Sequence, residues 1–134
     1  MSILTLTTTD QADPVQLTIL HVAGRLDANT EGTLRERADQ LFEGGTRNLV
    51  IDMAQVDYIS SAGLRAIFLI YKQFTPADET SSRQPEDEMY KSPYIKLANA
   101  TPEVYGVLNL AGFLHNIPFF PTLKEALDSF KQRS

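Results

Sequence analysis

The sequence predicts an α/β fold: a single domain with a mixed, mostly parallel sheet, an antiparallel hairpin at its N-terminal end, and helices packed mainly on one face. From residue 48 onward, short apolar runs alternate with segments whose apolar residues recur at helical spacing, which is typical of right-handed strand–helix–strand units. Before them, two apolar segments separated by a turn indicate a hairpin. The chain has 134 residues, 43% of them hydrophobic, which suits one core better than two.

The first two segments predict the hairpin. Apolar residues start a short strand over 3–6, and a turn follows through 10–14. Apolar residues then alternate with polar ones over 15–22, as expected for a strand with one buried face. We expect Gly24-Arg25-Leu26-Asp27 to break this second strand.

Two helices and a buried strand follow. Asn29 or Thr30 is expected to cap the first helix, and Gly44-Gly45 to end it. The apolar run Leu49-Val50-Ile51, closed by Asp52, predicts a strand buried on both faces. The second helix then turns one apolar stripe toward the sheet, made of Leu64, Ile67, Phe68, Tyr71 and Phe74.

Residues 75–93 interrupt this alternation. The stretch holds three prolines, five acidic residues and few apolar side chains. Such a composition buries too little apolar surface to offset the entropy lost on ordering, so we expect a flexible acidic insertion. The fold resumes with a strand over 94–97, a helix opened by Pro102, a short strand over 117–120 and a terminal helix. The helix after Pro102 is expected to turn inward Val104, Val107, Leu108 and Ala111.

Composition argues against several functional classes. The formal charge of −5 and the lack of a Lys/Arg stripe indicate no nucleic-acid surface. Cysteine is absent, and His21 and His115 lack a metal-ligand spacing. There is no Walker loop and no Gly-x-Gly-x-x-Gly after a strand, so we expect no nucleotide cofactor, and we expect no metal held by cysteine or histidine. There is no signal-peptide pattern and no apolar run of about 18 residues, so we expect a cytoplasmic protein with no membrane partner.

The most informative run is Tyr58-Ile59-Ser60-Ser61-Ala62-Gly63-Leu64-Arg65. It places two hydroxyls where a buried strand region gives way to an amphipathic helix. Ser60 or Ser61 therefore lies at a helix N-terminus, where unpaired backbone N–H groups favour an acceptor or an anion. A plain N-cap explains one serine. The second serine, and a glycine that bares the backbone to another molecule, indicate a site that tolerates a phosphate.

Asp27, Asp52 and Asp57 form a second candidate site. The carboxyl ends of the strands are expected to bring them together near the serines, as a divalent-cation site or as a negative rim that a partner recognises. Alternatively, Asp52 and Asp57 satisfy loop backbone N–H groups, which we favour for Asp57. Ser61 has neither a Gly-x-Ser-x-Gly elbow nor an evident histidine base, so we expect no catalytic residues and no hydrolase.

Several segments, taken in order, resemble the STAS domain family, the group that includes bacterial anti-sigma factor antagonists. Gly24-Arg25-Leu26-Asp27 is similar to its Gly-x-Leu-Asp signature, and segments 49–52 and 56–64 are similar to its central motif. Similarity continues through 96–98, 102–104, Leu108, Gly112-Phe113 and 123–127. The resemblance implies one STAS-like domain over 1–134, with the insertion at 75–93.

In antagonists of this family, the serine of an Asp-Ser-(Ser/Thr)-Gly-Leu motif is phosphorylated by an ATP-using anti-sigma factor kinase. Matched from the glycine backwards, that serine is Ser61, and Ser60 is the second choice. Ser60 stands where the motif has aspartate, and Ala62 stands where it has Ser or Thr. These departures put kinase recognition in question.

The resemblance implies a regulatory binding protein that is not an enzyme. Its partner would be an anti-sigma factor with a histidine-kinase-like ATPase fold that acts as the serine kinase, and a serine phosphatase would reset the switch. The residues expected to bind the partner are Asp27, Ser60, Ser61, Gly63, Leu64 and Arg65.

Two alternatives stay open. The family also contains members without a phospho-switch, which act as scaffolds in stress-signalling assemblies or as accessory subunits of transport systems. In such a protein Ser60 and Ser61 would be caps only. The third hypothesis is a small-ligand or nucleotide-binding enzyme that uses the aspartates and serines.

Overall fold

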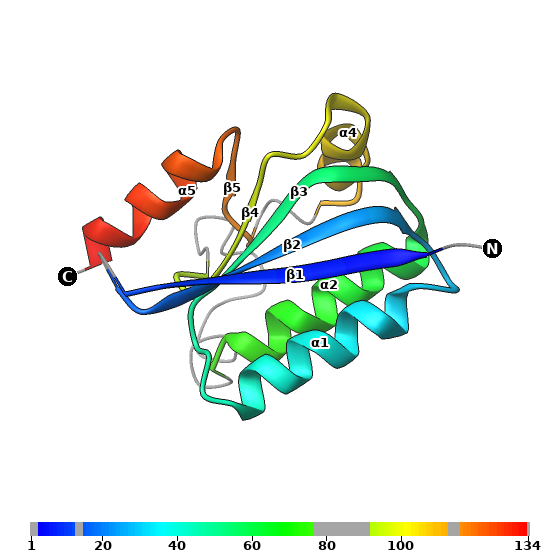
Figure 1. The fold of residues 1–134 in the computed structure, drawn as a ribbon. Helices are drawn as coiled ribbons and strands as arrows, with labels where there is room; N and C mark the ends of the chain where they lie inside the picture. The colour runs from blue at the N-terminus through cyan, green and yellow to red at the C-terminus, as the bar shows by residue number, and fades with distance from the viewer. Residues whose placement is uncertain (1–2, 13–14, 77–91, 113–115, 134) are drawn as a thin grey trace.

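The computed structural model describes residues 3–12, 15–76, 92–112 and 116–133. Their centre is a five-stranded sheet in the order β1-β2-β3-β4-β5 (Figure 1). β1 and β2 are antiparallel, and every other neighbouring pair is parallel, which confirms the predicted mixed sheet and its hairpin. The elements are β1 (Leu4–Gln11), β2 (Leu17–Leu26), α1 (Glu31–Glu43), β3 (Leu49–Ile59), α2 (Ser61–Phe74), β4 (Ile95–Ala98), α4 (Pro102–Leu110), β5 (Phe119–Phe120), α5 (Leu123–Ser129) and a final 3-10 turn, η2 (Phe130–Arg133).

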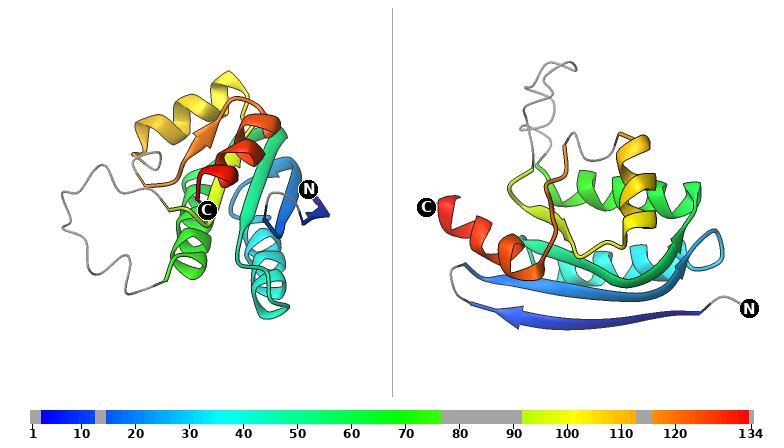
Figure 2. Two further views of the ribbon diagram at one scale, coloured as in Figure 1. Left: turned by 90° about the vertical axis from the view of Figure 1, so that its left-hand side faces the viewer. Right: turned by 90° about the horizontal axis from the view of Figure 1, so that it is seen from above.

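The helices pack mainly on one face of the sheet, as predicted. α1 and α2 lie side by side beneath the sheet in Figure 1 and share its main hydrophobic core with α4. α5 and η2 instead cover part of the opposite face, where Ala126 and Phe130 pack against Leu17, Ile19 and Val50 (Figures 1 and 2). None of the described helices is long and apolar enough to cross a membrane.

β2 and β3 are longer than the sequence indicates. β3 continues past Asp52 to Ile59, and β2 passes through Gly24 without breaking. The two strands pair from Thr18 and Leu49 to Leu26 and Ile59, with register shifts between His21 and Ala23 and between Gly24 and Arg25. Backbone pairing between two long strands, rather than the apolar run, sets their length. Gly24 has a φ of +120°, and a β-carbon there would clash with the carbonyl oxygen of Ile3, just before β1, so this glycine permits the chain to approach.

Two helices bury a stripe that differs in part from the predicted one. In α2, Ile67, Tyr71 and Phe74 are buried as predicted. In α2 the side chain of Phe68 is 42% exposed, whereas Ala66 and Ile70 are buried. The inward face of α2 therefore includes Ala66 and Ile70 in place of Phe68. In α4 only Val104 and Leu108 are buried, so the expectation that Val107 and Ala111 point inward is wrong. The helix has only nine residues, and it contacts the core through this one pair of side chains, spaced i, i+4.

The ends of the expected insertion are held together. Residues 77–91 lie outside the described residues, as does His115. On either side of this stretch, the buried hydroxyls of Thr75 and Ser92 are 2.9 Å apart. The backbone N–H of Tyr94 donates to the same Ser92 oxygen at 3.2 Å, which links the pair to the start of β4.

Candidate functional site at the start of helix α2

The serine pair lies where β3 leaves the sheet. β3 ends at Ile59 and α2 begins at Ser61, as the sequence predicts. The backbone N–H of Ser60 donates to the carbonyl oxygen of Leu26 at 2.9 Å, which anchors the turn on the end of β2. The carbonyl oxygen of Ser60 then accepts the first helical hydrogen bond, from Leu64 N–H at 2.9 Å.

The two serines have different surroundings. Ser60 has an extended backbone, and its Oγ accepts the N–H of Gly63 at 3.3 Å, so Ser60 is the N-cap of α2. Serine and aspartate are about equally favourable N-caps, so the serine that stands in place of the motif's aspartate is a suitable cap for α2. Ser61 is exposed, and its hydroxyl makes no hydrogen bond with any residue that the structure describes. One hydroxyl is used by the fold, and its neighbour is accessible.

Gly63 has an internal reason to be glycine. The residue is buried, and a β-carbon there would lie 2.6 Å from the carbonyl oxygen of Leu26 and 2.9 Å from Cγ1 of Ile59. The interpretation that Gly63 opens the backbone to another molecule is therefore wrong. The close approach is that of the protein's own β2 and β3 ends to the first turn of α2.

Asp27 supports the loop between β2 and α1. Its Oδ1 accepts the backbone N–H of Asn29 at 2.9 Å, and its Oδ2 lies 3.7 Å from Nε of Arg25. Only 15% of its side chain is exposed. Thr30 occupies the N-cap position of α1, but its hydroxyl donates to the carbonyl oxygen of Arg25 at 2.7 Å instead of capping the helix. Asp27 is thus a turn residue directly after Leu26, and its side chain is mostly covered.

A hollow of about 440 Å³ opens between α1 and α2 beside Ser61. Glu31 and Arg35 of α1 line it, opposite Ser61, Ala62, Arg65 and Leu69 of α2. Arg35 donates to both carboxylate oxygens of Glu31, from Nε at 2.6 Å and from Nη2 at 3.3 Å. The hydrogen bond from Arg35 lowers the pKa of Glu31 against the effect of burial, and the charge of Arg65 lowers it further.

Sequence reasoning missed Glu31 and Arg35 as members of this site. The signal for their mutual pairing was present, because Glu31 and Arg35 stand four residues apart on a predicted helix. Their position beside Ser61 comes from the packing of α1 on α2, which the spacing alone does not give. Of the residues expected to bind a partner, Ser61 and Arg65 are exposed and Ser60 and Leu64 are partly exposed.

The three aspartates do not converge. Asp52 lies opposite His21 in β2, whereas Asp27 follows Leu26, which pairs with Ile59 at the far end of β3. Within the described residues, no group of three His, Cys, Asp or Glu side chains is arranged to hold a metal ion. The prediction of a shared acidic site is wrong because β3 extends well past Asp52. Asp57 is an exposed residue within that strand, so its interpretation as a loop residue is also wrong.

Asp52 instead belongs to a hydrogen-bonded cluster across the sheet. Its Oδ2 is 2.7 Å from Nδ1 of His21, and Nε2 of His21 is 3.0 Å from Oγ1 of Thr9. Asp52 Oδ1 accepts Ala54 N–H at 3.1 Å and the side-chain amide of Asn99 at 3.2 Å. Burial raises the pKa of Asp52, but the hydrogen bonds from His21, Ala54 and Asn99 together outweigh it and lower that pKa. The cluster joins β1, β2 and β3.

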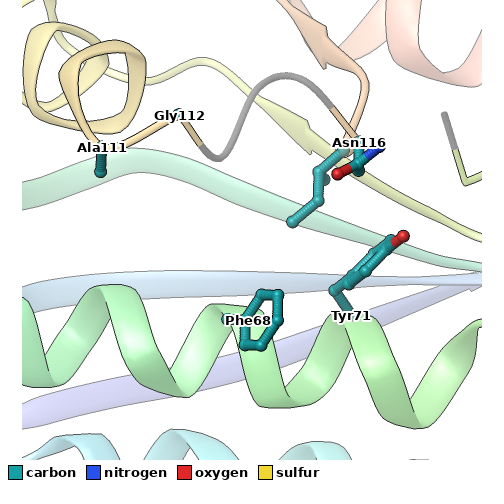
Figure 3. Close-up of a pocket in the computed structure, with 6 residues that line it drawn as sticks. Phe68, Tyr71, Ala111, Gly112 and Asn116 are labelled. Carbon is teal, nitrogen blue, oxygen red and sulfur yellow. The ribbon is translucent and has the colours of Figure 1, made fainter. Parts of the chain in front are cut away.

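A separate hollow of about 150 Å³ lies farther along α2 (Figure 3). Phe68 and Tyr71 form one side of it, and the other side comes from Ala111, Gly112, Asn116 and Ile117. Burial raises the pKa of the Tyr71 hydroxyl. None of the described residues that line it is charged, so these residues provide no cation for a nucleotide phosphate.

Comparisons with known proteins identify the family of this chain. A model of the STAS domain family matches residues 6–78. A relative from Bordetella bronchiseptica strain RB50, named putative anti-sigma factor antagonist BtrV, is 35% identical over 104 residues, which are 78% of this chain and 77% of the relative.

Solved structures show the same fold. An anti-sigma factor antagonist from Mycobacterium paratuberculosis has a TM-score of 0.76 at 20% identity, over 96% of this chain and 95% of that one. The Bacillus cell fate determinant SpoIIAA in its phosphorylated form has a TM-score of 0.57 at 15% identity, over 91% and 97%. The family model spans more than half of the chain, and the Bordetella relative covers most of it, so this protein belongs to the STAS domain family.

Proposed function

We propose that this STAS domain is an anti-sigma factor antagonist whose binding is switched by phosphorylation of Ser61. The observation that carries the proposal is the division between the serines: Ser60 caps α2, while the Ser61 hydroxyl beside it is exposed. The name of the Bordetella relative supports the antagonist function. The phosphorylated form of SpoIIAA, a protein of the same fold, supports the switch.

The partner is proposed to be an anti-sigma factor with a histidine-kinase-like ATPase fold. Ser60, Ser61, Leu64 and Arg65 form the docking face. Asp27 supports the neighbouring loop between β2 and α1, and Gly63 supports the first turn of α2. Docking of the unmodified protein releases a sigma factor, or another captive regulator, in the cytoplasm. The domain performs no catalysis in this scheme.

Phosphorylation of Ser61 prevents the docking face from binding the partner. Oγ of Ser61 attacks the γ-phosphorus of ATP, the bond to the bridging oxygen breaks, ADP leaves, and the hydroxyl proton passes to a base of the kinase. The product carries about −1.5 to −2 extra charge on Ser61. Because each 1.4 kcal/mol is about a tenfold change in affinity, a modest electrostatic penalty suffices to release the partner. A serine phosphatase restores the hydroxyl.

The proposal is tested by phosphorylation of single-serine variants. The immobilised protein is used to capture the ATPase from extract of its own cells, and mass spectrometry identifies the captured protein. Incubation with that ATPase and MgATP is expected to add one phosphoryl group to the wild type and to Ser60→Ala, and none to Ser61→Ala. A full mass shift in Ser61→Ala would refute the assignment of the acceptor.

A binding measurement separates the switch from a scaffold. Ser61→Asp is expected to weaken the ATPase complex at least tenfold in calorimetry, while Ser61→Ala binds like the wild type. A scaffold or transport-complex subunit would instead form a high-mass assembly that Ser61→Glu leaves unchanged. That result, together with no transfer of phosphate, would replace the proposed function with the scaffold.

A further inference from the structure

The hollow beside Ser61 is rich in positive charge. Two arginines and one glutamate line it, which leaves one net positive charge next to the accessible hydroxyl. Arg65 lies four residues after Ser61 in α2, so the two side chains share one helix face. Among the described residues Arg65 has no ion-pair partner, whereas Arg35 is held by Glu31. Arg65 can therefore bind an anion directly, whereas Arg35 must first separate from Glu31.

We propose that Arg65 and Arg35 form an intramolecular receptor for the phosphoryl group on Ser61. The inference rests on the proposed function and names the side chains that bind the added phosphoryl group. Arg65 pairs first, because it has no ion pair to break among the described residues, whereas Arg35 is already bonded to Glu31. A phosphate offers Arg35 more negative charge than the Glu31 carboxylate and accepts the same forked pair of hydrogen bonds. The Glu31–Arg35 pair therefore loosens when Ser61 is modified.

The receptor explains how modification changes the docking face. In the unmodified protein, Arg65 is exposed and contributes a positive charge to that face. A phosphoserine of about −1.5 to −2 charge changes the hollow from one net positive charge to a net negative one. Partner groups that pair with Arg65 lose it to the phosphate. Repulsion by Asp27 is a weaker explanation, because its carboxylate is mostly covered and bonded to the loop.

Phosphoserine placed at position 61 during translation tests the receptor without any kinase. Phosphorus NMR then follows the second ionisation of the phosphate in the wild type and in three single variants: Arg65→Gln, Arg35→Gln and Arg37→Gln. Arg37 is the matched control, because it is also an arginine of α1 but does not line the hollow. Thermal unfolding of the unmodified variants verifies that each one is folded.

The wild-type phosphate is expected to titrate below its ordinary pKa of about 6, since nearby cations favour the doubly charged form. Arg65→Gln and Arg35→Gln are each expected to raise the midpoint by about half a pH unit or more, and Arg37→Gln to leave it unchanged. Coincident midpoints in all four proteins would overturn the receptor. If the kinase still modifies Ser61, that result leaves the proposed function standing. If the kinase does not modify Ser61, the proposed function is refuted, but the titration of the phosphoserine protein still tests the receptor.

Discussion

Gly63 faces Leu26 so closely that a β-carbon at position 63 would lie 2.6 Å from the Leu26 carbonyl oxygen and 2.8 Å from its Cγ. The same carbonyl oxygen accepts the backbone N–H of Ser60. One peptide group at the end of β2 therefore both anchors the turn before α2 and limits the size of the residue in its first turn. The position of the serine pair depends on this contact.

Gly63→Ala is expected to lower the free energy of unfolding by about 1–3 kcal/mol, because the added methyl group meets backbone and core atoms that cannot move aside easily. Urea unfolding followed by circular dichroism measures the change. Gly32→Ala in α1 is the matched control, since no atom lies within 4 Å of its added β-carbon. That control should gain up to about 1 kcal/mol from helix propensity. Equal effects of the two substitutions would contradict the packing argument.

Ser60→Ala and Ser61→Ala are expected to separate stability from modification. Removal of the N-cap hydroxyl at position 60 should cost about 1 kcal/mol of stability. The exposed hydroxyl at 61 makes no hydrogen bond with the described residues, so its loss should change stability by less than about 0.5 kcal/mol. Thermal and urea unfolding test both values. A larger cost at 61 than at 60 would reverse the assignment of cap and acceptor.

Asp52 is expected to make stability depend on pH in the acid range. Its pKa is lower in the folded protein than in the unfolded chain, where aspartate titrates near about 3.9. The folded state therefore binds fewer protons, and the stabilisation is complete above the unfolded pKa and lost as the pH falls through the folded pKa. In urea unfolding from pH 6 to pH 3, the wild type should lose stability more steeply than Asp52→Asn. Parallel curves would show that the cluster around His21 does not favour the ionised carboxylate.

We propose that residues 75–93 are an insertion that the fold does not need. Replacement of residues 77–91 by a Gly/Ser linker of about six residues should leave the thermal midpoint nearly unchanged, because the Thr75 and Ser92 hydroxyls hold the flanks together and loop-closure entropy varies slowly with length. Differential scanning calorimetry measures the midpoint.

The flanking pair supplies the control for that deletion. Ser92→Ala in the full chain removes the partner of the buried Thr75 hydroxyl and should cost about 1–3 kcal/mol. A large loss of stability on deletion, with little effect of Ser92→Ala, would show that residues 77–91 themselves support the fold.

Local sequence patterns were sufficient for the kinds and order of the elements. The run Leu49-Val50-Ile51 marks a strand that is buried on both faces, and the helical spacing after Gly63 marks α2. The ends of the strands were not predictable in the same way. β3 continues through Asp52 because it pairs with β2 there, and no local feature of Asp52 records that partner.

Local sequence patterns also predicted only part of the candidate site. Adjacent residues and helical spacing were enough to place the serine pair at the start of a helix and to place Arg65 on that helix. The burial of Gly63 depends on Leu26, and the hollow depends on Glu31 and Arg35 of another helix. Such contacts arise from tertiary packing. A single sequence shows which side chains are present but not which of them lie next to one another in the fold.

The N-cap of α2 and the accessible hydroxyl belong to different side chains, Ser60 and Ser61. In the proposed switch, a phosphoryl group is added to Ser61 and removed again while Ser60 continues to cap the helix, so we expect each cycle to need neither partial unfolding nor chaperones. The speed of such a signal is then governed by the turnover of the attaching and removing enzymes rather than by the conformational kinetics of the domain.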